Sequence, residues 1–151
     1  MKLVATHRKA YRDYKIIEKY EAGIALKGGE VKSLRMGKCS LDGSFCRVEK
    51  GELIAYNIHI PEFEQSSYFK HNPRRERKLL LKKRELKRLS GLLTQRGYTI
   101  IPLRMYFNDR GWAKLEVALC KGMRKYEKRR KIKDGEARRE VEREISRFYR
   151  R

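Results

Sequence analysis

Alternation of hydrophobic and polar residues predicts short strands across the first half of the chain. Residues 14–20 and 21–26 have the pattern of strands, and the glycine pair at 28–29 ends this run. Residues 30–35 predict a short helical turn that stops at Gly37. This part of the chain is therefore expected to be β structure with one small helix.

A hairpin is predicted next, because residues 45–50 and 52–60 both alternate and are separated by Lys50-Gly51. The residues expected on one face of its second strand are Ile54, Tyr56, Ile58 and Ile60. Residues 61–78 lack a clear period and contain two prolines, which indicates a long surface loop.

One amphipathic helix is predicted over residues 82–96. Leu86, Leu89 and Leu93 lie at the i, i+3 and i+7 positions, which places them on one face. Gly97 follows where a helix commonly ends.

The last two strands have the clearest pattern. In residues 98–107 the set Thr99, Ile101, Leu103, Met105 and Phe107 alternates with Ile100, Pro102, Arg104 and Tyr106. Pro102 lacks an N–H and therefore predicts an edge strand or a bulge. Residues 108–111 predict a turn, and the strand over 112–120 directs Ala113, Leu115, Val117 and Leu119 to one face.

Five or six twisted strands, with a helix inserted before the last pair, are typical of a small closed or nearly closed barrel of the oligonucleotide-binding type. We therefore expect a mainly β fold with a few short helices over residues 1–121. Residues 122–151 are expected to form a basic C-terminal tail.

Positive charge indicates what such a barrel binds. The chain has 40 Lys and Arg against 19 Asp and Glu, a formal net charge of +21. A compact domain repels itself at such a charge, so a bound polyanion is the simplest explanation. Nucleic acid is favoured over an anionic membrane surface, because no basic helix with a Trp, Leu or Phe face is recognisable.

The tail has few apolar residues of core size, so we expect it to be disordered when free. Its distal part is expected to become helical when bound, or else to pack on its own barrel. The residues that would share one helical face are Ala137, Val141, Ile145 and Phe148.

Catalytic signatures are missing from the sequence, which contains no G-x-x-x-x-G-K-[ST], G-x-S-x-G or H-E-x-x-H motif. Its aspartates are too scattered in sequence to suggest a metal-dependent nuclease. The three cysteines form no C-x-x-C pair, so we expect reduced buried thiols, no metal site and no cofactor. Neither a spanning segment nor a secretory signal is recognisable, and the cytoplasm is the expected compartment.

A dense basic cluster lies between residues 74 and 88. Its members are Arg74, Arg75, Arg77, Lys78, Lys82, Lys83, Arg84, Lys87 and Arg88, and the only acidic residues between them are Glu76 and Glu85. Such an imbalance favours a surface that contacts phosphates. Tyr68 and Tyr126 lie in basic surroundings and are candidates for stacking on unpaired bases.

Three motifs occur in a characteristic order: Glu21-Ala22-Gly23-Ile24, Gly29-Glu30-Val31-Lys32-Ser33-Leu34-Arg35 and Arg77-Lys78-Leu79-Leu80-Leu81. Together with His7-Arg8-Lys9-Ala10 and His71-Asn72-Pro73, they make the chain resemble the bacterial small protein B family, the SsrA-binding proteins. The similarity covers essentially the whole chain. It implies an oligonucleotide-binding barrel that binds the tRNA-like domain of transfer-messenger RNA and takes part in trans-translation.

The resemblance also implies roles for individual residues. Those implied to face RNA are His7, Glu21, Lys32, Arg35, Lys78, Leu80 and Lys82. The tail is implied to enter the vacant decoding centre and mRNA channel of a stalled ribosome, which allows peptide tagging and ribosome rescue. The tail residues concerned are Gly122, Arg124, Lys125, Tyr126, Glu127, Lys128, Arg129, Lys131 and Lys133. The implied partners are transfer-messenger RNA and the ribosome with its 16S rRNA, and a monomer bound to RNA is expected.

Two of these assignments leave alternatives open. The Glu21 carboxylate would repel phosphates, so we expect it to accept hydrogen bonds from base amino groups or to orient a cation. Leu80 either offers an apolar surface to a base or fills the core. The chain departs from the family at His7, where Asn is usual, at Lys82, where His or Asn is usual, and at Glu127, where Asp is usual.

Overall fold

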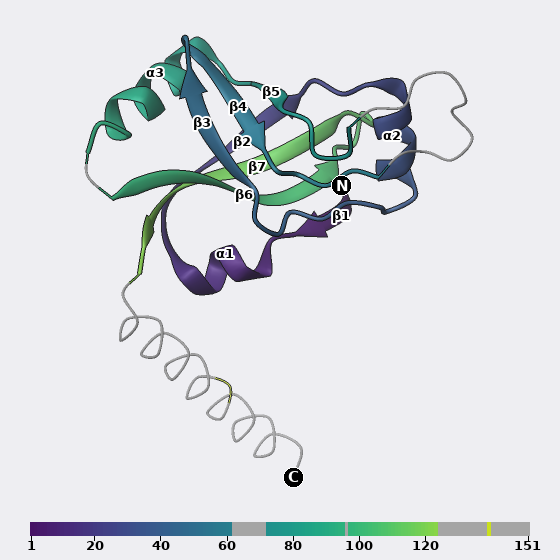
Figure 1. Ribbon diagram of the computed structural model, residues 1–151, viewed down its shortest axis with the longest axis horizontal. Helices are drawn as coiled ribbons and strands as arrows, with labels where there is room; N and C mark the ends of the chain where they lie inside the picture. Colours follow the sequence, from purple (N-terminus) through teal and green to yellow (C-terminus); the bar gives the residue numbers. More distant parts are fainter. Residues whose placement is uncertain (62–71, 96, 124–138, 140–151) are drawn as a thin grey trace.

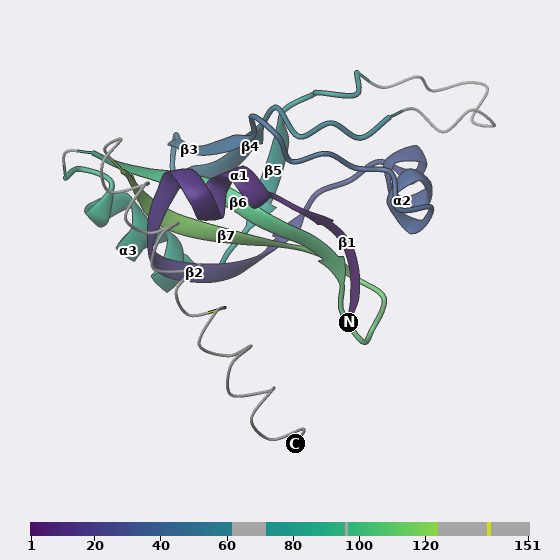
Figure 2. The same ribbon diagram turned by 90° about the horizontal axis from the view of Figure 1, so that it is seen from below.

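The computed structural model (Figure 1) describes residues 1–61, 72–95, 97–123 and 139, and contains seven strands and three helices within them. The strands are β1 (Lys2–Thr6), β2 (Tyr14–Ile24), β3 (Phe45–Glu49), β4 (Glu52–Tyr56), β5 (Arg77–Leu80), β6 (Tyr98–Phe107) and β7 (Ala113–Gly122). The helices are α1 (Arg8–Asp13), α2 (Gly28–Arg35) and α3 (Lys83–Leu92). Helices α2 and α3 lie at opposite ends of the strands in both Figure 1 and Figure 2.

The strands form a closed barrel. Their order is β1-β6-β3-β4-β5-β2-β7, and an additional pairing of β6 with β7 closes the ring, to which β1 is attached through β6. Adjacent strands are antiparallel throughout. The weakest seam is between β3 and β6, which pair only at Cys46 and Ile100. The mainly β fold with a few short helices is therefore confirmed.

The main core fills the barrel. Its most buried members include Leu53, Ala55, Leu79, Ile100, Met105, Leu115, Val117 and Leu119, each at most 3% exposed. A second cluster joins α1 to the outer side of β6 and β7 through Ala10, Ile101, Leu103, Ala118 and Cys120. Strands β6 and β7 are thus covered on both sides, which explains their dense runs of apolar residues.

A bulge in β6 decides which residues reach the main core. Pro102 is paired with Val117 and Arg104 with Glu116, so Leu103 is the extra residue. Ile101 and Leu103 therefore pack outside the barrel, whereas Met105 packs inside it. The bulge that Pro102 predicted is confirmed, and it divides the set of residues that alternation alone placed on one face.

The β3–β4 hairpin forms where it was predicted, and Lys50 and Gly51 both have positive φ angles, of 49° and 74°. The prediction that Ile54, Tyr56, Ile58 and Ile60 share one face of its second strand is wrong, however. Leu53 and Ala55 point into the core, whereas Ile54 lies on the outer side. The strand ends at Tyr56, because Asn57 adopts a φ of 66° and breaks the alternation before Ile58.

Three elements were not predicted. Strand β1 and helix α1 are short and largely exposed, so they have little hydrophobic periodicity. Strand β5 begins inside the predicted loop, with the charged pair Arg77 and Lys78. The remainder of that loop, residues 62–71, lies outside the described residues.

Helix α3 has the predicted apolar face. Leu89 is fully buried, and Leu86 and Leu93 pack against the core. The helix ends at Leu92, a turn before the predicted limit, and Gly97 follows with a φ of 88°. No helix in the described part of the chain is long and apolar enough to cross a membrane.

Candidate nucleic-acid interface

The outer side of β5, β2, β7 and β6 carries a row of residues in register. Leu80 pairs with Gly23, Gly23 with Lys114, and Lys114 with Tyr106. A parallel row joins Glu21, Glu116 and Arg104. We call this surface the β2 face. It comprises Glu21, Gly23, Lys78, Leu80, Arg104, Tyr106, Lys114 and Glu116.

Leu80 is the apolar centre of the β2 face. Its side chain is 55% exposed, although the residues on either side of it are at least partly buried. The neighbouring Gly23 has no side chain to cover it, and a Cβ added there would lie only 3.3 Å from the Leu80 Cβ. Of the two alternatives for Leu80, the structure therefore excludes the core and leaves an apolar surface open to a ligand.

Glu21 is held by a neighbour on the same face. The Tyr106 hydroxyl donates a hydrogen bond to Glu21 Oε2, although the two strands are separated by β7. Burial raises the pKa of Tyr106, and the bond to the Glu21 carboxylate raises it further, so the hydroxyl keeps its proton near neutral pH. Tyr106 therefore orients the Glu21 carboxylate, and both roles expected for Glu21 stay predictions.

The cations expected to face RNA are exposed. Lys78 is about half exposed and its Nζ lies 3.0 Å from Glu52 Oε1. Such exposed pairs are weak, so the ammonium can exchange Glu52 for a phosphate. Lys32 and Arg35 lie exposed on α2, and Lys82 lies exposed just before α3. The candidate cations thus come from β5, from α2 and from the residue that precedes α3.

A buried ion-pair network fixes α2 relative to β5. Glu30 and Arg77 are both 0% exposed, and Arg77 Nε lies 2.7 Å from Glu30 Oε2. Arg77 Nη1 also donates to the Ile58 carbonyl at 2.7 Å, and Arg75 Nε donates to Glu30 Oε1 at 3.1 Å. Glu30 accepts a further bond from the Lys27 backbone N–H, which caps α2. The Glu30 carboxylate therefore links α2, which carries Lys32, to β5, which carries Lys78.

The predicted phosphate-contacting cluster at residues 74–88 is accordingly only partly correct. Arg77 does not reach solvent, Arg75 is bound to Glu30, and Arg88 lies 2.5 Å from Glu18. Lys82, Lys83, Arg84 and Lys87 remain on the surface. A count of charges in the sequence treats every Arg as exposed, whereas the buried Glu30 carboxylate binds both Arg75 and Arg77 and keeps them from contacting phosphates.

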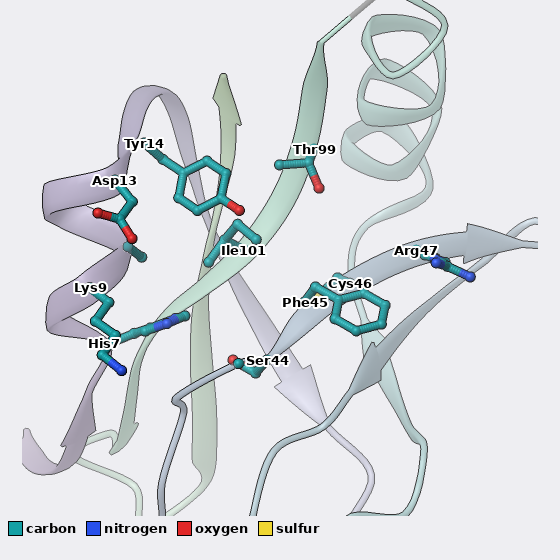
Figure 3. A pocket seen from close by; sticks show the side chains of 12 residues that line it. His7, Lys9, Asp13, Tyr14, Ser44, Phe45, Cys46, Arg47, Thr99 and Ile101 are labelled. Atoms are coloured by element: carbon teal, nitrogen blue, oxygen red, sulfur yellow. The ribbon is translucent and has the colours of Figure 1, made fainter. Parts of the chain in front are cut away.

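His7 lies in a different environment from the other candidates. It is 5% exposed, and its Nδ1 lies 2.9 Å from the Pro102 carbonyl oxygen, to which it donates, because a carbonyl oxygen can only accept. The ring lines a cavity between α1 and β3 (Figure 3). The structure does not bring His7 into the row from Leu80 to Tyr106.

The tail candidates lie outside the described residues, with the exception of Gly122. That residue pairs with Tyr14 at the end of β7, and the N–H of Met123 donates to the Asp13 carbonyl at 3.2 Å. The strand therefore extends one residue beyond the expected barrel limit at 121. Tyr68 and Tyr126 also lie outside the described residues.

Sequence reasoning missed Lys114, Tyr106 and Arg104 as members of the β2 face. Alternation had grouped Arg104 with Tyr106, and it had separated Lys114 from the core residues of its strand. The missing information was the pairing of β2 with β7, which sets Glu21 opposite Glu116. Nothing local in the sequence specifies that pairing.

The Cys39, Cys46 and Cys120 thiols are all free; Cys46 and Cys120 are buried, as expected, whereas Cys39 is only partly buried. Burial raises the pKa of Cys39 to about 12 and that of Cys120 to about 11, so both remain protonated. Within the described residues no group of three or more His, Cys, Asp or Glu side chains is placed to hold a metal ion.

Comparison with known proteins identifies relatives over nearly the full length. The family described as "SmpB protein" matches residues 4–147. A protein of Carboxydothermus hydrogenoformans named SsrA-binding protein is 50% identical over 148 residues, which are 98% of this chain and 99% of the relative. The SsrA-binding protein of Thermus thermophilus is 53% identical over 139 residues, 92% of this chain and 96% of the relative.

A solved structure is also similar. It is described as "tmRNA-SmpB: a journey to the center of the bacterial ribosome" and superimposes with a TM-score of 0.68 at 53% sequence identity. The match covers 81% of this chain and 85% of the other.

Proposed function

Because the chain belongs to the SmpB family, we propose that it is an RNA-binding protein of trans-translation that binds the tRNA-like domain of transfer-messenger RNA. Relatives named SsrA-binding protein and the structural relative described with tmRNA and the bacterial ribosome support this function. The observation that carries it is the β2 face, on which an exposed leucine and a carboxylate held by Tyr106 share one side of the barrel with Lys78, Arg104 and Lys114.

The β2 face, together with the cations on α2 and before α3, suits a folded RNA better than a plain duplex. Lys32, Arg35, Lys78 and Lys82 supply charge-assisted contacts to phosphates. Leu80 offers apolar surface to an unpaired base, and Glu21 accepts from base amino groups. Such contacts require bases that are splayed out of a helix, as the loops of a tRNA-like structure present them. We include His7 among the RNA-contacting residues, through the cavity that it lines.

For the ribosome we propose a second contact, made by residues 122–151. Gly122, Arg124, Lys125, Tyr126, Glu127, Lys128, Arg129, Lys131 and Lys133 would lie along the vacant decoding centre and mRNA channel. An excess of Lys and Arg over Asp and Glu in this segment suits a channel lined by rRNA phosphates. In this proposal the barrel, residues 1–121, delivers transfer-messenger RNA, and the tail engages the stalled ribosome.

The role proposed is binding without a catalytic step or cofactor, by a monomer in the cytoplasm. The family is one of SsrA-binding proteins, and the β2 face has the composition of a contact surface. Sequencing the RNA that co-purifies with the protein tests the assignment. One abundant species with a tRNA-like acceptor end is the expected result, and stoichiometric rRNA without such a species would contradict it.

Lys78→Ala and Arg35→Ala are each expected to weaken binding of the tRNA-like domain by roughly 1–3 kcal/mol, as for a charge-assisted contact. Fluorescence anisotropy with labelled RNA at fixed salt measures this change. Lys50→Ala is the matched control, because it removes one exposed lysine in the β3–β4 turn. Unchanged affinity in both variants, or an equal loss in the control, would contradict the assignment of Lys78 and Arg35 as RNA contacts.

A further inference from the structure

The seam between β3 and β6 leaves two strand edges open in the wall of the barrel. Both strands are described along their whole length, and their ladder consists of the single pair Cys46 and Ile100. Beyond that pair β3 continues to Glu49, and β6 begins at Tyr98, so each strand has residues with no partner strand across the seam. In Figure 3 the two strands diverge beyond Cys46. Closed barrels ordinarily have no such edges, which are where a further strand can pair.

The backbone groups of Val48 point into this opening. The two-residue turn of the β3–β4 hairpin makes Glu49 and Glu52 a hydrogen-bonded pair, and such pairs alternate along an antiparallel ladder with pairs that exchange no hydrogen bonds. The N–H and C=O of Val48 and Cys46 are therefore directed away from β4. Cys46 uses this edge to pair with Ile100, but Val48 has no ladder partner on it. Val48 thus offers one donor and one acceptor to an added strand.

A hollow of about 430 Å³ lies in the opening. It extends from β3 to the end of α3 and to the first residues of β6. Three apolar residues that line it, Val48, Leu93 and Tyr98, also pack against the main core. The volume lies within the range of small binding sites, about 300–1,000 Å³. An extended segment in this hollow would therefore meet open backbone groups at its edge and apolar side chains beneath it.

Positive charge lies at the rim of the hollow. Arg47 lines it and is exposed, and the exposed Lys50 follows in the hairpin turn. The acidic residue that lines the hollow, Glu49, already accepts a hydrogen bond from the Tyr56 hydroxyl. The whole chain carries a formal net charge of +21, which attracts acidic partners over longer distances. Side chains of an occupant that point outward from the seam are therefore expected to be acidic.

We propose that the β3–β6 seam is a docking site for an extended acidic peptide segment of a partner protein, which adds to the edge of β3 as a strand. Apolar residues at alternate positions would face Val48, Leu93 and Tyr98, and acidic residues between them would face Arg47. Main-chain hydrogen bonds supply affinity in this mode of binding, and the alternating side chains supply specificity. In the ring of strands, β4 and β7 separate the seam from the β5–β2 pairing, so RNA can occupy the β2 face at the same time.

Titration of the full-length ¹⁵N-labelled protein with the peptide Ac-Glu-Val-Glu-Val-Glu-Val-Glu-NH₂ tests the site. Saturable shifts are expected in the amide resonances of residues 46–49, 93–94 and 98–100, together with slower hydrogen exchange of the Val48 amide. The block sequence Ac-Glu-Glu-Glu-Glu-Val-Val-Val-NH₂ has the same composition and charge without the alternation, and it should not produce these shifts. Equal shifts with the block sequence would reduce the interaction to attraction between charges and overturn the proposal, as would shifts confined to other residues.

Two further probes identify the mode of binding. The alternating peptide with every backbone nitrogen methylated keeps its side chains but loses its N–H donors, so its binding should be lost. Retained binding of the methylated peptide would overturn the proposal, because no added strand would then be needed. A uridine heptamer that shifts the same resonances when the alternating peptide does not would assign the seam to nucleic acid and overturn the proposal as well.

Variants of the protein test the charge and the open edge separately. Arg47→Glu should weaken binding of the alternating peptide about three- to tenfold, because an exposed attraction becomes a repulsion. Arg110→Glu is the matched control, since it makes the same change of charge at an exposed residue of the β6–β7 turn that does not line the hollow. Val48→Pro removes the N–H at the open edge, where proline is tolerated, and should weaken binding about two- to tenfold, as for one lost hydrogen bond.

Unchanged peptide affinity in Arg47→Glu and Val48→Pro, or an equal loss in Arg110→Glu, would overturn the proposal. Arg47→Glu alone decides the matter if proline disturbs the hairpin, because Arg47 is exposed and its replacement leaves the core intact. Binding of the tRNA-like domain is measured separately on the same proteins. Failure of the peptide site would therefore leave the proposed function standing.

Discussion

Replacement of Glu30 by alanine is expected to lower the free energy of unfolding by about 3–5 kcal/mol, the usual cost of removing one partner from a buried ion pair. Arg77 would then remain 0% exposed with no carboxylate to neutralise it. Arg75 would lose the same partner. Urea unfolding of the two proteins, followed by circular dichroism, measures the difference.

The pKa values of the pair determine how this stability depends on pH. Burial raises the pKa of the Glu30 carboxyl, but hydrogen bonds from Arg75, the Lys27 N–H and Arg77 outweigh it and hold the pKa below its ordinary value of 4.5. Burial lowers the pKa of Arg77, and the bond to Glu30 opposes that change. A carboxyl with a lowered pKa contributes stability above its unfolded pKa, and the contribution is lost as pH falls through the folded value. Wild-type stability should therefore fall below about pH 4.5, more steeply than that of Glu30→Gln.

Two comparisons distinguish a buried charge from ordinary packing. Glu52→Ala removes the partner of Lys78 in a pair that is about half exposed, and it should cost less than about 1 kcal/mol. A double variant, Glu30→Leu with Arg77→Met, should recover much of the loss, because no charge is then left buried. If Glu30→Ala costs no more than Glu52→Ala, the network does not hold α2 on β5.

Loss of the Glu30 charge should also affect RNA binding, although Glu30 does not itself contact RNA. Glu30 itself is buried, whereas Lys32 and Arg35 on α2 and Lys78 on β5 are exposed candidate contacts. Under conditions where the variant is fully folded, Glu30→Gln should weaken binding of the tRNA-like domain, although it removes no cation from the β2 face. A loss of affinity that persists under those conditions assigns Glu30 a positioning role.

Local signals in the sequence predicted the elements whose conformation is decided by neighbouring residues. Lys50 and Gly51 adopt the positive φ angles that a tight hairpin needs, and Gly97, which follows α3, also has a positive φ angle. Leu86, Leu89 and Leu93 gave the buried face of α3, because packing there follows the helical period. Strand β5 was not predicted, because its first inward-facing residue is the charged Arg77, which breaks the hydrophobic pattern of a buried strand face.

Non-local partners account for the remaining errors. The inward position of Arg77 depends on Glu30, 47 residues earlier, and no period in the sequence expresses that distance. The β2 face depends on the β2–β7 register, which places Lys114 beside Gly23 and so near Leu80. Family motifs identified Glu21, Lys78 and Leu80, but only the register shows that Tyr106 holds Glu21.

Truncation of the chain after Met123 is expected to abolish peptide tagging on stalled ribosomes while leaving the affinity for the tRNA-like domain within about twofold, because every residue of the β2 face is retained. A cut after Met123 is preferable to one after Lys121, the barrel limit expected from the sequence. Gly122 still pairs with Tyr14, and the Met123 N–H still bonds to Asp13, so the cut spares the end of β7. A reconstituted translation reaction with an mRNA that lacks a stop codon, together with anisotropy for RNA binding, measures both quantities.

The full-length Lys78→Ala variant provides the reciprocal case, since it should lose RNA affinity while retaining the whole tail. Its tagging should recover when the concentration of transfer-messenger RNA is raised, whereas the truncated protein should not recover at any concentration. This difference follows from mass action, because excess ligand compensates for a weakened contact but not for a missing one. Normal tagging by the truncated protein would show that the barrel alone performs both steps, and the division of the chain at residue 122 would then have no functional meaning.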